Sequence, residues 1–170
     1  MFLENQYVTD VVNELAAESC HELFSDYGIE LVRGAHDWSN ADQPVLSSVM
    51  GFVGAPLRGT CLLACEHGPL DGSCPAGGSP RDWIGELGNQ LVGRIKVKLL
   101  TYEIDVALTT PIVLQGIRVQ PLPKHPTEPI TFKGGNGVVL VWLEVEVERD
   151  FVLPDPRPAN AGETGELMLF

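Results

Sequence analysis

Positive charge is scarce in this sequence. Lysine and arginine number 11 against 23 aspartates and glutamates, which leaves a formal net charge of −12 at pH 7. Binding to nucleic acid or to an anionic membrane surface requires clustered basic side chains. We therefore expect neither a nucleic acid nor a membrane among the partners.

Long apolar runs are also absent. No stretch approaches the roughly 18 consecutive apolar residues that a membrane-spanning helix requires. Residues 1–8 lack the basic segment and the apolar run of a secretory signal, so we expect a cytoplasmic protein. Hydrophobic residues nevertheless make up 44% of the 170 residues, which is sufficient for the core of one domain.

Cysteine occurs only four times, and no two cysteines form a Cys-x-x-Cys pair. Cys61 and Cys65 lie in a strand-like run, where residues four apart are separated by roughly 13 Å. That distance is too long for two ligands of one zinc ion. We expect no metal site, and we expect the cysteines to be buried free thiols: Cys20, Cys61, Cys65 and Cys74.

Two long helices are predicted. The first runs from about Thr9, a residue suited to cap a helix, to Tyr27 and ends at Gly28. The second begins at Ser79-Pro80-Arg81-Asp82, with a capping serine, a proline in the first turn and an acid three residues after the cap, and continues to about Leu100. Apolar residues at helical spacing define the buried face of the first helix: Val12, Ala16, Cys20, Leu23, Phe24 and Tyr27.

Short apolar runs predict the β-strands, at residues 29–32, 45–53, 57–65, 103–108, 112–119 and 138–147. Residues 66–79 are rich in glycine and proline and are predicted to be a loop. Each long helix leads into a strand, and the second such unit follows the first by 75 residues. We therefore expect an α+β domain over residues 1–152, and a disordered tail over the Pro- and Gly-rich residues 153–170.

The second helix carries a polar stripe. At 100° per residue, Asp82, Glu86, Asn89 and Gly93 fall within about 60° of one another. A glutamate can bind a lysine of a partner, and an asparagine amide can hold a water molecule by both accepting and donating hydrogen bonds. Phosphoryl transfer requires little more than in-line placement of that water and charge compensation. From the spacing alone, a solvated polar stripe is the commoner interpretation.

Glycine interrupts the same helix at Gly85 and Gly93. A glycine inside a helix costs roughly 1 kcal/mol relative to alanine. Close approach of a partner surface would explain these residues, and so would tight packing inside the domain. Trp83, at the start of the helix, is expected to lie in the core rather than to contact a partner.

Residues 83–94, with the sequence Trp-Ile-Gly-Glu-Leu-Gly-Asn-Gln-Leu-Val-Gly-Arg, resemble the signature helix of the CheC/CheX/FliY chemotaxis phosphatases. That family's pattern has Asp or Ser, Glu four residues later, Asn three further on, and a more distant Pro; the matching residues here are Asp82, Glu86, Asn89 and Pro111. The resemblance covers residues 5–150. The first half carries Val11 and Glu14 where the motif would repeat, so the resemblance is to CheX, which has one motif, rather than to CheC.

The resemblance implies a mixed β-sheet with two long helices from two pseudo-repeated halves. It also implies a phosphatase, a hydrolase that removes the phosphoryl group from the aspartate of a CheY-like response-regulator receiver in chemotaxis or two-component signalling. Glu86 would bind a lysine of the receiver and Asn89 would orient the attacking water, as the two catalytic residues. Contacts to the partner would come from Asp82, Gly85, Glu86 and Gly93. The receiver would supply Mg²⁺, the phosphatase would need no cofactor of its own, and the chain would form a homodimer.

Two other functions are open on the sequence. The same fold could bind a receiver without catalysis, or act as a flagellar-switch-like interaction module; the intact Glu86 and Asn89 argue against this. An unrelated hydrolase is the other alternative, but the sequence contains no Gly-x-Ser-x-Gly elbow, no Walker loop and no Gly-x-Gly-x-x-Gly fingerprint. The four histidines are scattered along the chain and are expected to be structural or solvated.

Overall fold

Three helices and seven strands make up the described part of the chain. The computed structural model describes residues 2–35, 45–117, 119, 121–124 and 127–158. The elements are, in order, α1 (Phe2–Asp26), β1 (Val32–Arg33), β2 (Val45–Val53), β3 (Leu57–Cys65), α2 (His67–Ser73), α3 (Pro80–Leu100), β4 (Ala107–Leu108), β5 (Ile112–Gly116), β6 (Ile130–Gly134) and β7 (Gly137–Val147).

The strands form one sheet. Its order is β1-β6-β7-β3-β2-β4, and β5 also pairs with β2. The longest ladder joins β3 to β7, from the pair Leu57–Val147 to the pair Cys65–Val139. The expected α+β class with two long helices is confirmed, and the sheet, expected as mixed, has only antiparallel pairs among the described strands.

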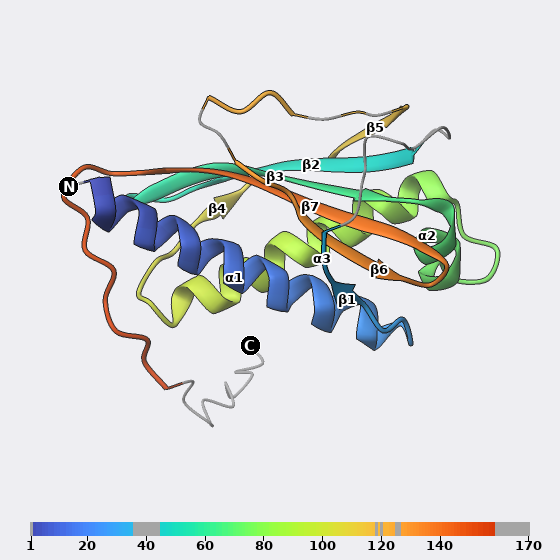
Figure 1. Cartoon of the computed structure of the whole chain (residues 1–170), viewed down its shortest axis with the longest axis horizontal. Helices are drawn as coiled ribbons and strands as arrows, with labels where there is room; N and C mark the ends of the chain where they lie inside the picture. The colour runs from blue at the N-terminus through green and yellow to red at the C-terminus, as the bar shows by residue number, and fades with distance from the viewer. Residues whose placement is uncertain (1, 36–44, 118, 120, 125–126, 159–170) are drawn as a thin grey trace, which may run out of the picture.

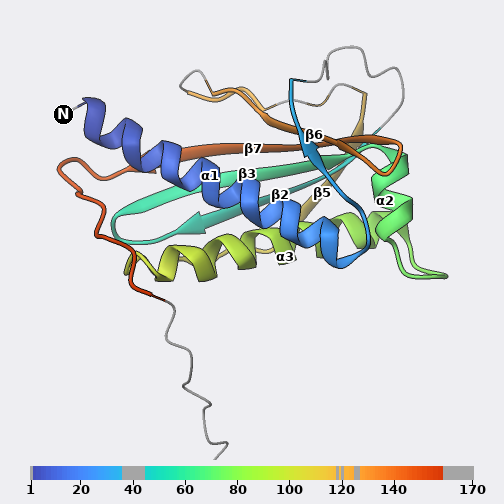
Figure 2. The same cartoon turned by 60° about the horizontal axis from the view of Figure 1, so that its bottom comes forward.

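The two long helices lie next to each other across one face of the sheet, with α1 over β7 and α3 over β2 (Figures 1 and 2). The core fills the space between this helical layer and the sheet. In β7 the residues facing the helices are Val139, Val141 and Leu143, which alternate along the strand and are buried.

A second, smaller apolar cluster lies on the opposite face of the sheet. It consists of Val45, Leu62, Ala64 and Leu140, with Val49, Val138 and Trp142 packed around them. Lys124, from the segment between β5 and β6, lies on this face: its backbone N–H donates to the Glu144 carboxylate at 2.8 Å, and its ammonium lies 2.5 Å from the Glu146 carboxylate. The apolar cluster thus buries Leu140 in the first half of β7, and Lys124 pairs with the carboxylates of its second half.

Helix α1 begins earlier than the sequence predicts. It starts at Phe2 rather than near Thr9. The Thr9 hydroxyl donates to the backbone carbonyl of Asn5, one turn earlier, at 3.0 Å. Threonine in a helix can bond backwards in this way instead of capping, so the capping residue type was misleading here. The predicted end is correct, because Gly28 adopts a left-handed conformation with φ of 75° directly after the helix.

Residues 66–79, predicted to be a loop, contain the short helix α2. Its Leu70 is 1% exposed, and the Ser73 hydroxyl donates to the carbonyls of Pro69 and Leu70 at 2.9 and 3.0 Å. Burial of one leucine and local side-chain hydrogen bonds thus form a helix that composition alone did not indicate.

Strand lengths also differ from the prediction. The strands expected at 29–32 and 103–108 shorten to the two-residue strands β1 and β4, and β6 was not predicted. β6 joins β7 through Gly135 and Asn136, which both have positive φ values of 58° and 63°. This is a tight hairpin of the kind that glycine and asparagine favour.

The last described residues, 151–158, have no regular secondary structure. The Arg157 backbone N–H donates to the Thr101 carbonyl at 2.8 Å, and the Arg157 guanidinium pairs with Glu103. Residues 153–158, expected as the start of a disordered tail, are therefore held against the end of α3, whereas residues 159–170 lie outside the described part. No described helix combines the length and the apolar character needed to cross a membrane.

Candidate active site

Helix α3 forms where the sequence predicts, for local reasons. The Ser79 hydroxyl caps it by accepting from the Asp82 backbone N–H at 3.4 Å, and Pro80 occupies the first turn. One stripe faces the sheet and is buried; it includes Ile84, Leu87, Leu91, Ile95 and Leu99. The side chains of Asp82, Glu86 and Asn89 are consequently turned to solvent.

A hollow of about 450 Å³ lies over this polar stripe. Residues of α3 and of the segment that enters β5 line it: Arg81, Asp82, Gly85, Glu86, Asn89, Pro111 and Val113. The structure thus gathers Asp82, Gly85, Glu86, Asn89 and Pro111 in one place, although Pro111 is 22 residues from Asn89 in the sequence. Gly93 lies elsewhere, in a second hollow between α1 and α3.

The glycines of α3 have different surroundings. Gly85 is buried, and a Cβ there would lie 3.2 Å from Cγ2 of Val113. Gly88, which the sequence analysis did not single out, is the more tightly packed: a Cβ would lie 2.1 Å from Oγ and 2.6 Å from Cβ of Ser48. At Gly93 a Cβ would meet nothing within 4 Å. Internal packing therefore accounts for Gly85 and Gly88, and it gives no reason for Gly93.

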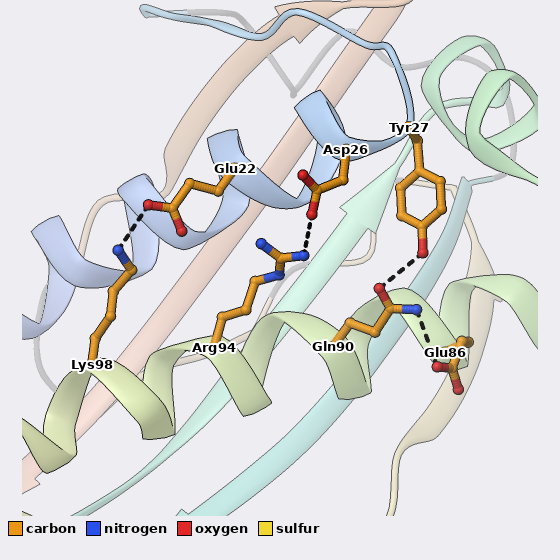
Figure 3. Close-up of polar contacts among 7 residues, drawn as sticks. All are labelled: Glu22, Asp26, Tyr27, Glu86, Gln90, Arg94 and Lys98. Carbon is orange, nitrogen blue, oxygen red and sulfur yellow. Dashed lines mark hydrogen bonds and ion pairs between the residues drawn. The ribbon is translucent and has the colours of Figure 1, made fainter. Parts of the chain in front are cut away.

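The Glu86 carboxylate is held by its neighbour on the helix. Gln90 donates from Nε2 to Glu86 Oε1 at 3.1 Å, and the hydroxyl of Tyr27, the residue that follows α1, donates to Gln90 Oε1 at 2.9 Å (Figure 3). The hydroxyl of Tyr27 thereby orients the amide so that its NH₂ group faces Glu86. One carboxylate oxygen of Glu86 is used in this way, and the other has no hydrogen-bond partner among the described residues.

The orienting residues are themselves packed. The ring of Tyr27 meets the ring of Trp83 edge-on, with centroids 5.2 Å apart and an interplanar angle of 86°. Trp83 Nε1 donates to the Ser73 hydroxyl of α2 at 3.0 Å, and the indole packs against the core. The expectation that Trp83 is a core residue is confirmed. The sequence did not indicate Tyr27 and Gln90 as supports of Glu86, because their contact joins residues 63 positions apart.

Asn89 is exposed, and its side-chain amide has no hydrogen-bond partner within the part of the chain that the structure describes. It can therefore accept from and donate to water. Glu86 and Asn89 are three residues apart on one helix, so their side chains occupy neighbouring positions. The arrangement can bind a cation at the carboxylate and hold a water molecule beside it.

Ion pairs fix α3 against α1 beyond the hollow (Figure 3). The Lys98 ammonium lies 2.9 Å from Glu22 and 3.4 Å from Glu18, and the Arg94 guanidinium lies 2.5 Å from Asp26. The hydrogen bond that Lys98 donates to Glu22, together with the negative charges of Glu22 and Glu18, outweighs the effect of burial and raises the pKa of Lys98 above its usual value. These contacts hold the helix that carries Glu86 and Asn89 in a fixed orientation.

Within the described residues, no group of three or more histidine, cysteine, aspartate or glutamate side chains is arranged to hold a metal ion. The four cysteines are free thiols, and three of them, Cys20, Cys61 and Cys65, are buried. Burial raises the pKa of the Cys61 thiol to about 12 and also raises those of Cys20 and Cys65. These thiols belong to the core, as the sequence predicts.

No protein-family model matches the chain, and no curated protein matches it in sequence. Solved structures do match. A CheC-like superfamily protein from Shewanella sp. PV-4 aligns with a TM-score of 0.67 and 19% identity, covering 79% of this chain and 97% of that one. Chemotaxis protein CheX from Vibrio vulnificus aligns with a TM-score of 0.65 and 18% identity, covering 78% and 97%.

Two further matches extend the comparison. CheX in a CheX–CheY–BeF₃–Mg²⁺ complex from Borrelia burgdorferi aligns with a TM-score of 0.54 and 11% identity, covering 78% of this chain and 96% of that one. FliY from Thermotoga maritima aligns with a TM-score of 0.56 and 14% identity, covering 86% and 91%. The chain therefore has the fold of the CheC, CheX and FliY chemotaxis proteins. The CheX-like fold expected from the motif is confirmed.

Proposed function

We propose that this chain is a phosphatase that removes the phosphoryl group from the aspartate of a CheY-like response-regulator receiver. The observation that carries the proposal is the hollow in which Glu86, Asn89 and Pro111 meet. The motif residues, which the sequence separates, line one surface in a fold shared with CheX. The likeness to a CheX protein in complex with CheY, BeF₃ and Mg²⁺ supports a receiver as the partner, since beryllium trifluoride stands in for a phosphoryl group.

The proposed chemistry uses two side chains. The free oxygen of Glu86 pairs with a lysine ammonium of the receiver and sets the register of docking. The Asn89 amide orients a water molecule for in-line attack on phosphorus. The new bond joins the water oxygen to phosphorus, and the bond from phosphorus to the aspartate oxygen breaks. The aspartate leaves as a carboxylate, and the protons of the water remain on the inorganic phosphate.

The receiver supplies Mg²⁺ in this proposal. Only two carboxylates, Asp82 and Glu86, line the hollow, and Mg²⁺ in phosphoryl-transfer sites is usually bound by carboxylates together with phosphate oxygens and water. Such a set forms once the phosphorylated receiver contributes its own acidic residues. We assign Asp82 and Gly85 to the contact surface with the receiver, because both border the hollow; Gly93, in the neighbouring hollow, would contact the partner further along α3.

The test is loss of phosphate from phosphorylated receivers of the same organism, followed with and without this protein. Wild type should accelerate the loss, Asn89→Ala should abolish the acceleration while retaining binding, and Glu86→Ala should weaken binding. Glu148→Ala is the matched control, because it removes an equal charge at an exposed residue remote from the hollow. Equal activity of Asn89→Ala and wild type would exclude the assigned role of Asn89.

The likeness to FliY favours one alternative, a module that binds a receiver or joins a flagellar-switch-like assembly without hydrolysis. Measurable binding to a receiver, without acceleration by the wild-type protein, would support this alternative over the phosphatase.

We further propose that the protein is a cytoplasmic homodimer. Four free thiols fit a reducing compartment, and the exposed apolar residues Ile112 and Ile117 at β5 offer surface for a second copy. Light scattering of the purified protein measures the mass directly, and a monomer at micromolar concentration would contradict the dimer.

A further inference from the structure

Arg81 shares the hollow with Glu86 and Asn89, and the motif does not include it. It is the second residue of α3 and is exposed. Its guanidinium has no hydrogen-bond or ion-pair partner among the described residues. The other basic residues of α3 are each paired: Arg94 with Asp26, Lys96 with Asp105, and Lys98 with Glu18 and Glu22. Among the described residues, Arg81 is thus the basic residue of α3 without an ion pair, and its charge is available to a ligand.

Arg81 lies in one row along α3 with Asn89, the residue proposed to hold the water. Arg81, Gly85 and Asn89 are spaced by four residues, so they lie along the same side of α3. Eight residues correspond to roughly 12 Å along a helix. Gly85, between the two polar residues, has no side chain, and Val113 packs against it. Arg81 and Asn89 therefore flank the part of the hollow that Gly85 and Val113 line.

The negative charges around this space would be compensated by a cation. The other charged groups that line the hollow are the carboxylates of Asp82 and Glu86, and the whole chain has a net charge of −12. A phosphoryl group entering the hollow carries negative charge and would be repelled by these groups. Asp82 does not neutralise Arg81, because adjacent residues on a helix point in different directions.

We propose that Arg81 is a further catalytic residue, which binds the phosphoryl oxygens of the phosphorylated receiver during transfer to water. This inference rests on the proposed phosphatase function. Arginine suits the role because its planar group can donate two parallel hydrogen bonds to phosphoryl oxygens. Arg81 stays protonated throughout; it donates hydrogen bonds to the phosphoryl oxygens, which spread the negative charge of the transition state. The bond from the water oxygen to phosphorus forms, and the bond from phosphorus to the aspartate oxygen breaks.

The test compares Arg81→Ala, Arg81→Lys and wild type on a phosphorylated receiver. Arg149→Ala is the matched control, because Arg149 is exposed, lies outside the hollow and forms no ion pair with another described residue. We expect Arg81→Ala to lower kcat by about ten- to a hundredfold, less than the loss of a donor in a buried oxyanion hole because this hollow is open to water. Arg81→Lys should recover part of kcat, and Arg149→Ala should keep all of it.

A binding measurement distinguishes contact of Arg81 with the phosphoryl group from electrostatic attraction between Arg81 and the rest of the receiver. The wild-type protein should bind a receiver loaded with beryllium trifluoride and Mg²⁺ more tightly than the same receiver with Mg²⁺ alone. Arg81→Ala should lose most of this preference, and Arg149→Ala should retain it. An equal loss of affinity for both forms, with unchanged kcat, would make Arg81 a docking charge and overturn the proposal.

The two proposals fail in different ways. If wild type accelerates phosphate loss and Asn89→Ala does not, while Arg81→Ala retains the wild-type kcat, only the role of Arg81 is overturned. If wild type does not accelerate phosphate loss from any receiver, the phosphatase function is overturned and the role of Arg81 with it. Circular dichroism and thermal unfolding of Arg81→Ala should match wild type, since the side chain is exposed.

Discussion

Replacing Gly88 with alanine should destabilise the protein, although alanine is the better helix former. A Cβ at this position would lie 2.1 Å from Oγ and 2.6 Å from Cβ of Ser48 in β2. The Ser48 hydroxyl can rotate away, but its Cβ is fixed by the strand backbone. Because carbon atoms pack at about 3.5 Å or more, α3 and β2 must separate by roughly 1 Å at this point.

The magnitude follows from two opposing terms. Exchange of glycine for alanine inside a helix contributes about 1 kcal/mol of stability, whereas overpacking of a well-packed core costs typically about 1–3 kcal/mol. The neighbours Leu87 and Leu91 are fully buried and would shift with the helix, so we expect the upper part of that range. The free energy of unfolding should fall by about 1–2 kcal/mol, which corresponds to a decrease in Tm of about 2–8 °C at this chain length.

Gly93→Ala is the matched control on the same helix. No atom lies within 4 Å of the added Cβ, so only the propensity term remains and the variant should gain about 0.8–1 kcal/mol. Urea unfolding followed by circular dichroism measures both variants. A Gly88→Ala protein as stable as wild type would refute the packing argument. Ser48→Gly in the Gly88→Ala background removes both contacting atoms and should recover part of the loss.

Three other predictions concern the supports of the site and the core. Tyr27→Phe keeps the ring against Trp83 but removes the hydrogen bond that orients Gln90, so KM for the phosphorylated receiver should rise about 2- to 10-fold with little change in kcat; an unchanged KM would contradict the support. A thiol reagent should modify Cys74 in the native protein and the three buried cysteines only after unfolding, and a second rapidly reacting thiol would contradict their burial. Lys98→Met should cost about 0.5–1 kcal/mol at pH 7. Because the pKa of Lys98 is raised in the folded state, this difference from wild type should be complete below about pH 10.5 and shrink as the pH rises further; a difference that persists at high pH would contradict it.

The local sequence predicted what local interactions determine. The ends of α3 were correct because the Ser79 cap, Pro80 and the apolar stripe all act within a few residues. The start of α1 was wrong because a threonine serves equally well as a cap or inside a helix, and only the hydrogen bond to Asn5 distinguishes the two. Strand β6 was missed because its pairing with β7, rather than its own short apolar run, stabilises it.

The two faces of β7 were predictable, because alternation along a strand depends on nothing but its period of two. The polar stripe of α3 was predictable for the same reason, with a helical period. The period of a helix or strand does not reveal which other elements of the fold each stripe contacts. The contact of Tyr27 with Gln90 and the position of Arg81 over the hollow depend on where α1, α3 and β5 come together.

The hollow itself results from the way α3 seats on two paired strands. Ser48 of β2 and Val113 of β5 are partners in the sheet, and Gly88 packs on the first while Gly85 packs on the second. Two glycines three residues apart on one helix thus contact both members of a single strand pair. A side chain at Gly88 would push the helix off that pair, and the entry to β5 that carries Pro111 would move away from the polar stripe. The glycines therefore affect the site by allowing α3 to pack closely on β2 and β5. A motif defined by polar residues alone does not include this packing requirement.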